Sequence, residues 1–271
     1  TPTLAYAVPS APTPTAVAGA TDLPGNTELF TVPNSKTPRG IVATGADEFY
    51  VLVNNAGGDL IYKLDASGNL ITAWNSDGIA PVTLNGDPVY DAEGITIVGS
   101  NIYVSNNQYN DIHQTGSSLL KFAVATGAEA DIDSAVTGEN SCGISDWRNL
   151  VGLATDGTKL WGISDWGGEV YKYRTNCEDV TSYYLNWPQP NSPNGLALGA
   201  DNNEFFFIAS GENIDKREKK NDSNSLNTYA YTGDEQVTGA SYFGGLLYTA
   251  NGIMNMKNAK WKDDFSVIDE F

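Results

Sequence analysis

The chain has 271 residues and a formal net charge of −18, with 33 acidic against 15 basic residues. Nucleic acids and anionic membrane surfaces attract basic faces, so this acidic balance argues against both as partners. No apolar run approaches the roughly 20 residues that cross a bilayer, which argues against membrane insertion. Tyr (14), Trp (6) and Gly (28) are abundant, and residues that favour strands and turns indicate an all-β fold.

The first residues differ in composition from the rest. Residues 1–26 are rich in Thr, Pro, Ala and Ser, which do not form a packed face, so we expect an extended lead segment there. Residues 27–271 are predicted to form one domain. Because the chain begins at Thr1 rather than Met, we expect either a processed mature form or an excised piece of a longer chain, with any signal peptide already removed.

Five segments of the chain share one outline. Each has a glycine followed by apolar residues, then a short aromatic strand 9 to 11 residues later, and then a further apolar strand. A constant unit separated by variable insertions is typical of repeated supersecondary elements joined by loops. The five repeat glycines are Gly40, Gly94, Gly152, Gly195 and Gly239.

These repeats predict an all-β fold with a single β-propeller of five or six four-stranded blades, favoured over a β-sandwich. Residues 70–74 are expected to be the outer strand of the first unit, and 226–231 the third strand of the fourth. The third strand of the fifth unit is not evident. Residues 28–32 are expected to add an outer strand to the last blade and so close the ring. A degenerate sixth blade from residues 1–37 and part of a later insertion is the alternative.

The two cysteines, Cys142 and Cys177, are too few for a disulfide framework and lack metal-site spacing. We expect one disulfide, which closes a loop of about 35 residues and stabilises the fold by on the order of 3–4 kcal/mol. The alternative is two free buried thiols in a cytosolic protein. A disulfide predicts a secreted, extracellular or cell-surface location. Asn221 begins an Asn-Asp-Ser pattern that fits N-glycosylation.

Two repeat motifs carry a family resemblance. The Pro-Arg-Gly-Ile segment at 38–41, followed by Asp-Ala-Ser-Gly-Asn at 65–69, resembles an NHL repeat. The Pro-Asn-Gly-Leu segment at 193–196 resembles the related gluconolactonase/regucalcin-like propellers, in which this Asn binds a divalent metal, usually calcium. The Glu-Gly pair at 93–94 resembles the segment that supplies a second ligand. The resemblance therefore implies a propeller with a calcium site at the channel mouth.

The residue before each repeat glycine is expected to face the central channel. Calcium takes six to eight oxygen ligands, some of them water. Glu93 and Asn194 match the metal ligands implied by the resemblance, and Asn149 is the further candidate. Val151 offers no side-chain oxygen, Thr238 stands where the resemblance implies an acid, and Arg39 adds a positive charge.

A second ring of polar residues follows the second strands of the units. Asn106, Asp165 and Asn251 are candidates for hydrogen-bonding a polar ligand, and Trp166 for stacking on a sugar. Asn and Asp at strand ends are also common turn formers. No catalytic residues are assigned, because His113 is the only histidine and no Gly-x-Ser-x-Gly motif is present.

The basic run Lys216–Lys220 is expected in a solvated loop, with partner docking or protease sensitivity as the alternatives. The leading interpretation is a non-enzymatic extracellular propeller that binds a protein or carbohydrate partner at one face, on loops 75–91, 106–118 and 209–225. The alternatives are a calcium-dependent lactonase- or esterase-like hydrolase and a structural surface or matrix protein.

Overall fold

The computed structural model is almost entirely β-structure, with one short 3-10 helix, η1, at Pro33–Ser35. No helix among the described residues is long and apolar enough to cross a membrane. The lead segment 1–26 lies outside the described residues. The structure describes residues 28–45, 47–107, 117–132, 141–144, 149–165, 168–185, 193–199, 205–211, 213–221, 225–230, 237–243, 246–251 and 257–262.

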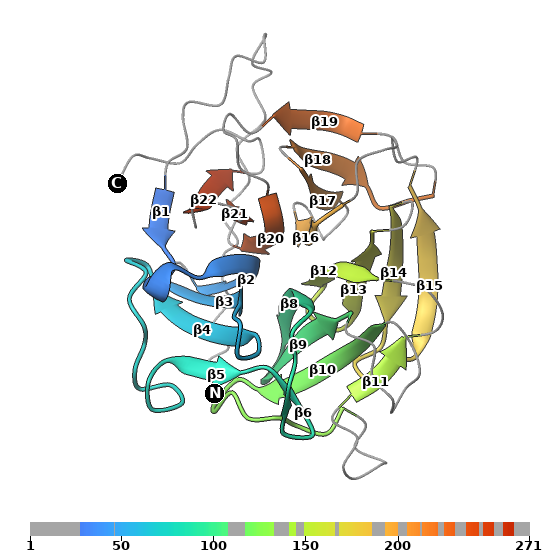
Figure 1. The fold of residues 1–271 in the computed structure, drawn as a ribbon. Coiled ribbons are helices and arrows are strands. Elements are labelled where there is room, and N and C mark those ends of the chain that lie inside the picture. Colours follow the sequence, from blue (N-terminus) through green and yellow to red (C-terminus); the bar gives the residue numbers. More distant parts are fainter. Residues whose placement is uncertain are drawn as a thin grey trace, which may run out of the picture.

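Five four-stranded antiparallel sheets are arranged around a central axis as the blades of a β-propeller (Figure 1). Blade 1 consists of β2 (Thr37–Gly45), β3 (Glu48–Asn54), β4 (Leu60–Asp65) and β5 (Ile79–Pro81). Blade 2 consists of β8 (Ala92–Val98), β9 (Asn101–Asn106), β10 (Ser117–Ala123) and β11 (Ser141–Ile144). Blade 3 consists of β12 (Leu150–Thr155), β13 (Leu160–Ser164), β14 (Glu169–Tyr173) and β15 (Asp179–Tyr184).

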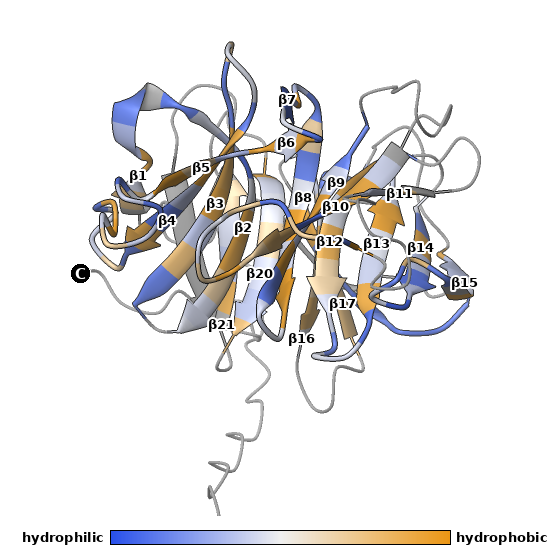
Figure 2. Ribbon diagram, turned by 90° about the horizontal axis from the view of Figure 1, so that it is seen from below, coloured by the Kyte–Doolittle hydropathy of each residue, from blue (hydrophilic) through white to orange (hydrophobic). Residues whose placement is uncertain are grey.

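Blade 4 consists of β16 (Gly195–Gly199), β17 (Phe205–Ser210), β18 (Asn213–Glu218) and β19 (Ser225–Ala230). Blade 5 consists of β20 (Val237–Phe243), β21 (Leu246–Asn251), β22 (Lys257–Lys262) and β1 (Glu28–Thr31). A small hairpin, β6 (Thr83–Leu84) and β7 (Asp87–Pro88), projects at one end of the ring (Figure 2). The inner strands are β2, β8, β12, β16 and β20.

The first described strand completes the last blade. β1 pairs antiparallel with β22, so blade 5 combines both ends of the described chain. This confirms the predicted closure by residues near 28–32. Such pairing removes a sheet edge and fastens the ring at its seam. The described residues contain no sixth four-stranded sheet.

The five repeat glycines bring the inner strands into backbone contact. A Cβ added at Gly152 would lie 2.5 Å from the backbone nitrogen of Leu196, and one at Gly239 would lie 2.7 Å from the Cα of Gly40. No side chain fits at these distances, so only glycine permits the approach. Each glycine meets the next inner strand, and the contacts return to blade 1 after blade 5. We call this set the glycine ring: Gly40, Gly94, Gly152, Gly195 and Gly239.

Apolar side chains fill the seams between blades. At the seam of blades 1 and 2, Leu52 and Ile61 are fully buried in one cluster with Ile102 and Val104. Burying a side chain of this size stabilises the fold by about 1.5–3 kcal/mol. The predicted second strands are therefore the buried middle layer of each blade.

Two predicted strands are wrong. Residues 70–74 form a turn with one isolated bridge to β4, and the outer strand of blade 1 is β5, at 79–81. Residues 226–231 were expected as the third strand of blade 4, but 225–230 are its outer strand β19. The third strand of blade 4 is β18, which contains most of the basic run.

The basic run is largely packed rather than a solvated loop. Arg217 is 1% exposed and pairs with buried Asp215, with 3.3 Å between Nη2 and Oδ2. The ammonium groups of Lys216 and Lys219 lie 4.6 Å and 4.8 Å from the ring centres of Phe205 and Trp161. Cation–π contacts of this kind hold lysines along aromatic surfaces. Loops 75–91 and 209–225 likewise contain strands, and most of 106–118 lies outside the described residues.

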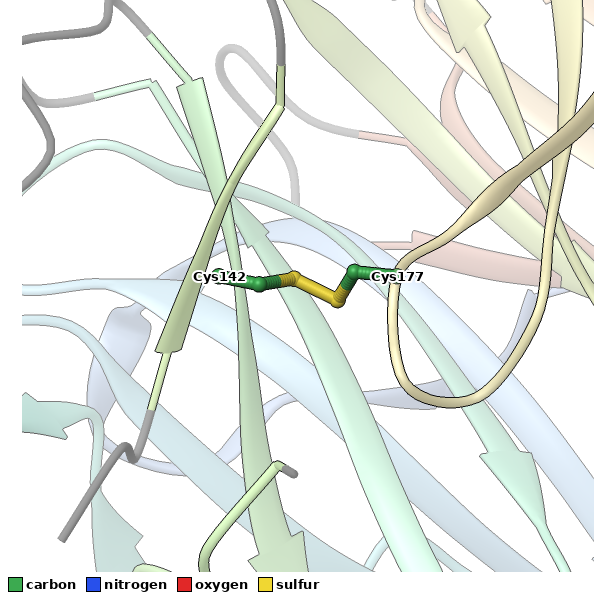
Figure 3. The surroundings of a disulfide bond; sticks show 2 residues. All are labelled: Cys142 and Cys177. Atoms are coloured by element: carbon green, nitrogen blue, oxygen red, sulfur yellow. A yellow bond between two sulfur atoms is a disulfide. The ribbon is translucent and has the colours of Figure 1, made fainter. Parts of the chain in front are cut away.

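The predicted disulfide is confirmed. Cys142 on β11 and Cys177 in the turn after β14 are bonded, with their Cα atoms 6.3 Å apart (Figure 3). This separation is ordinary for a disulfide. The bond joins the outer strand of blade 2 to blade 3, so it crosslinks one seam of the ring.

Candidate functional site

The channel mouth is the end of the ring where the inner strands begin. In four blades the residue before the repeat glycine has no partner on the neighbouring strand, because the pairing register between the inner strand and the second strand shifts at that position. These irregularities lie between Pro38 and Gly40, between Ala92 and Ile95, between Leu150 and Gly152, and between Val237 and Gly239. A β-bulge re-aims a side chain out of the regular alternation. These irregularities therefore free four side chains from the regular alternation of the inner strands: Arg39, Glu93, Val151 and Thr238.

Arg39 and Glu93 form an ion pair between blades 1 and 2. The Nη1 of Arg39 donates to the Oε1 of Glu93 at 2.6 Å, and the two side chains are 33% and 17% exposed. The pair links residues that are 54 positions apart in the sequence. The pair therefore remains partly open to solvent.

The Glu93 carboxyl group titrates far above its ordinary range. Burial disfavours its charged form and raises its pKa to about 7, Arg39 opposes this rise, and the neighbouring Asp91 carboxyl adds to it. A hydrogen bond with Asp91 also favours the protonated form. Near neutral pH, Glu93 therefore exchanges a proton readily, which is the property of a general acid or base.

Asp59 fixes the loop beside this pair. Its carboxylate accepts backbone hydrogen bonds from Asn55 at 3.2 Å and Ala92 at 2.9 Å, and the residue is 1% exposed. Burial raises the pKa of Asp59, although both backbone donors oppose the rise. Because Ala92 precedes Glu93, the contact anchors the start of β8 to blade 1 and holds the mouth carboxyl in position.

The other residues before the glycines have different surroundings. The Thr238 hydroxyl donates to the backbone oxygen of Pro38 at 3.0 Å and bridges blades 5 and 1. Val151 is half-buried against the core of blades 3 and 4. Asn194 is half-buried, and its backbone nitrogen donates to Ala209 at 2.7 Å. The charge of this ring is therefore concentrated on Arg39 and Glu93.

Two predicted site residues lie together at the start of blade 3. The Asn149 Nδ2 donates to the Asp165 Oδ2 at 3.2 Å, and the Asp165 backbone nitrogen donates to the Asn149 oxygen at 3.1 Å. These two bonds cross between the ends of β12 and β13. The two hydrogen bonds give both residues a structural role, which is to hold the ends of these strands together. Their predicted roles as ligand-binding residues stay predictions.

The remaining residues predicted to bind a polar ligand are Asn106, Trp166 and Asn251. Asn106 is 1% exposed, and its Nδ2 donates to the Ser118 hydroxyl at 3.2 Å. Trp166 lies outside the described residues. Asn251 ends β21, where it pairs with Lys257, and its side chain is outside the described part.

The predicted calcium set is Glu93, Asn194 and Asn149. Glu93 already contacts Arg39, so a cation there has to compete with a guanidinium. Asn149 contacts Asp165. Within the described ranges, no three His, Cys, Asp or Glu side chains gather in a way that could hold a metal ion. The geometry thus offers calcium no ready cluster, and the site stays a prediction.

No known family model matches the chain, and no curated protein matches it. Among solved structures, glutaminyl cyclase from Myxococcus xanthus matches with a TM-score of 0.58 and 13% identity, covering 89% of this chain and 95% of that chain. At this identity the likeness shows the fold alone, a β-propeller.

Two further solved structures match at lower TM-scores. A chain of a nidogen/laminin complex matches at 0.48 with 13% identity, covering 80% of this chain and 73% of that chain. A catalytically inactive virginiamycin B lyase from Staphylococcus aureus, crystallised with quinupristin, matches at 0.45 with 11% identity and coverage of 84% and 96%.

Sequence reasoning selected Glu93 but missed its partner. Arg39 was expected only as an added positive charge on the rim, because spacing does not reveal which blades face each other there. The recurring position before a repeat glycine was the available signal. Asp91 and Asp59, which shape the mouth, carry no repeat signature and were not selected.

Proposed function

We propose that this chain is a ligand-binding propeller whose channel mouth takes a polar ligand through Arg39 and Glu93. The observation that carries the proposal is their partly exposed ion pair, set on irregular strand positions directly before the glycine ring. Both side chains are partly exposed, at 33% and 17%, so a ligand can reach the pair from solvent. A ligand with matching groups can therefore replace it.

The charges at the mouth favour a particular class of ligand. Carboxyl groups of Asp91 and Glu93 favour an amine, the guanidinium of Arg39 favours a neighbouring carbonyl or carboxylate, and the net charge of −18 attracts cations. The amino-terminal end of a peptide presents an amine beside a carbonyl. We therefore propose a peptide or protein partner that inserts its free amino terminus.

Calorimetric titration with Gln-Ala tests this binding role, with N-acetyl-Gln-Ala as the matched ligand. We expect saturable binding of the free dipeptide only, weakened at least tenfold in Arg39→Met and in Glu93→Gln. Asp87→Asn, an exposed acid in the hairpin at the same end, should bind as the unmodified protein does. Equal binding of the acetylated dipeptide, or binding unchanged in both mouth variants, would contradict the proposal.

A second candidate is an enzyme that uses Glu93 for proton transfer. Its carboxyl pKa of about 7 suits a group that accepts and returns a proton near neutral pH. In cyclisation of an amino-terminal glutaminyl residue, the amine nitrogen attacks Cδ, the bond from Cδ to the amide nitrogen breaks, and ammonia leaves. Glu93 would carry the amine proton to the departing nitrogen.

Ammonia release from Gln-Ala separates the two candidates. Turnover that falls by about 10²–10⁴-fold in Glu93→Gln, the usual size of acid–base catalysis, supports the enzyme. Binding without ammonia release supports a binding protein. Asp87→Asn again serves as the control.

Calcium dependence remains a proposal of its own, implied by the resemblance to lactonase-like propellers. Its test is a thermal melt with and without calcium after chelator treatment, repeated on Glu93→Gln. A calcium-dependent rise in Tm that the variant loses would support a hydrolase of that type. No shift would remove this candidate, and self-assembly at high concentration would instead favour a structural role.

The disulfide bears on where the protein works. Disulfides persist in oxidising compartments and are rare in the cytosol, and Cys142–Cys177 joins two blades of this ring. We therefore propose an extracellular or cell-surface location, where peptide termini and protein partners are available. A free-thiol assay on protein isolated from its source tests this, and two reactive thiols would contradict it.

A further inference from the structure

A cavity lies at the end of the channel opposite the mouth, beyond the glycine ring. It has a volume of about 330 Å³ and is lined by all five inner strands. The lining begins one residue after each repeat glycine, and no residue of the mouth belongs to it. We call it the axial cavity, lined by 41–44, 95–97, 153–155, 196–198 and 240–243, together with Gly99.

Most of the side chains that line the axial cavity are apolar. Ile41, Ile95, Leu153 and Leu196 are each at most 3% exposed, and none of the described residues that line the cavity is charged. Its polar side chains are the hydroxyls of Thr44, Thr96, Thr155, Ser241 and Tyr242. The Ser241 hydroxyl accepts a hydrogen bond from the backbone nitrogen of Ala43 at 3.1 Å.

The shape of the cavity favours entry from the end opposite the mouth. At the glycine ring, on the side of the mouth, neighbouring inner strands touch through their backbones. At the far rim, Phe243 is 38% exposed and Ile97 is half-buried. Tyr242 beside them is held by stacking on Phe207, with ring centres 5.7 Å apart and planes 4° apart.

We propose that the axial cavity binds one small, neutral, apolar molecule, at a site separate from the mouth. The absence of charge among the lining residues disfavours an ionised ligand, because a buried charge needs a partner. A cavity of about 150 Å³ with aliphatic and aromatic walls is enough for benzene, and ordinary ligand pockets begin near 300 Å³. The size of this cavity therefore suits a single compact molecule rather than a folded partner.

Fluorescence titration with N-phenyl-1-naphthylamine, a neutral probe that brightens in apolar surroundings, tests the proposal on the full chain. We expect saturable 1:1 binding that toluene displaces and benzoate does not. Ile97→Trp, which narrows the half-buried rim, should weaken binding at least tenfold. Ala197→Leu, which fills part of the wall, should act in the same direction.

Tyr184→Ala is the matched control, because Tyr184 is 61% exposed on an outer strand and its loss should leave binding unchanged. Absence of a saturable signal would show that the cavity holds only water and would overturn the proposal. So would a signal that survives Ile97→Trp in folded protein but disappears in Tyr184→Ala. Toluene competition uses the unmodified chain, so the proposal stays testable if a cavity variant fails to fold. Glu93→Gln should not affect the probe, which separates this outcome from that of the mouth.

Discussion

The two ends of the central channel are built from the same five strands but differ in chemistry. At the mouth, irregular strand pairing presents Arg39 and Glu93, whose carboxyl pKa is raised to about 7. At the far end, the same strands surround a cavity of about 330 Å³ whose described lining residues carry no charge. In four blades the residue before the glycine departs from the ladder, whereas most of the residues that line the cavity follow it, with Thr44 in blade 1 as an exception. A shift in pairing thus separates a polar, titratable site from an apolar one.

The largest expected effect concerns the glycine ring that divides the two ends. Gly152→Ala places a Cβ 2.5 Å from the backbone of blade 4, and the strands have to separate to accept it. We expect a loss of about 3 kcal/mol in the free energy of unfolding, as for severe overpacking. Chemical denaturation measures this loss.

Gly45→Ala is the control for the ring, because its added Cβ meets nothing closer than 3.9 Å. That variant should change stability by less than about 0.5 kcal/mol, as at ordinary surface positions. Equal losses in the two variants would contradict a tight ring and remove the physical divide between the two ends.

The next effect is the pH dependence of stability at the mouth. Glu93 has a raised pKa in the folded state, from 4.5 to about 7, so the folded chain holds this proton more tightly than the unfolded chain. The resulting stabilisation is fully present below pH 4.5 and is lost as pH rises through 7. A shift of this size corresponds to ~3 kcal/mol, and solvent screening of the partly exposed pair lowers our expectation to about 2 kcal/mol.

Denaturation of the unmodified chain and of Glu93→Gln between pH 4.5 and 8 isolates this contribution, since other groups cancel in the difference. As pH rises over this range, the unmodified chain should lose about 2 kcal/mol more of its free energy of unfolding than Glu93→Gln does. A difference that is independent of pH would show that Glu93 titrates normally. Ser241→Ala, at the uncharged end, should show no such pH dependence relative to the unmodified chain.

The smallest effects compare the two ends at one seam, between blades 5 and 1. Thr238 donates to Pro38 at the mouth, and Ser241 accepts from Ala43 beside the axial cavity. Thr238→Val and Ser241→Ala should each cost about 1 kcal/mol, the usual net value of one hydrogen bond. Thermal melts measure both losses. Only Thr238→Val should weaken binding at the mouth, and equal effects on ligand binding would contradict the separation of the two sites.

Much of the fold was predictable from the sequence because glycine and apolar residues recur in each unit. The glycines, the buried second strands, the disulfide and the closing role of residues near 28–32 were all predicted and observed. The third strands of the first three blades were also predicted, but the outer strand of blade 1 and the third strands of blades 4 and 5 were not, because polar residues there give no clear alternation. In β18, the charges of Lys216 and Arg217 predicted a solvated loop. In the folded blade, Lys216 lies over the ring of Phe205 and Arg217 forms an ion pair with Asp215.

The site was predictable only in part. Glu93 was selected as a calcium ligand from its place before a repeat glycine and from the family resemblance, and that role stays a prediction, whereas its pairing with Arg39 depends on which side chains meet at the mouth. Asp59 could not be selected, because its role is to accept backbone hydrogen bonds from Asn55 and Ala92. Such contacts leave no trace in residue spacing.

The most direct test of the mouth is the pKa of Glu93, measured by carbon-13 NMR of its side-chain carboxyl across pH 4 to 9. The structure predicts a midpoint at about 7 that rises further in Arg39→Met, because the guanidinium stabilises the charged form. This result would establish a buried carboxyl that exchanges its proton near neutral pH beside Arg39. A midpoint near the ordinary value of 4.5, unchanged by the Arg39 substitution, would contradict the account of the mouth.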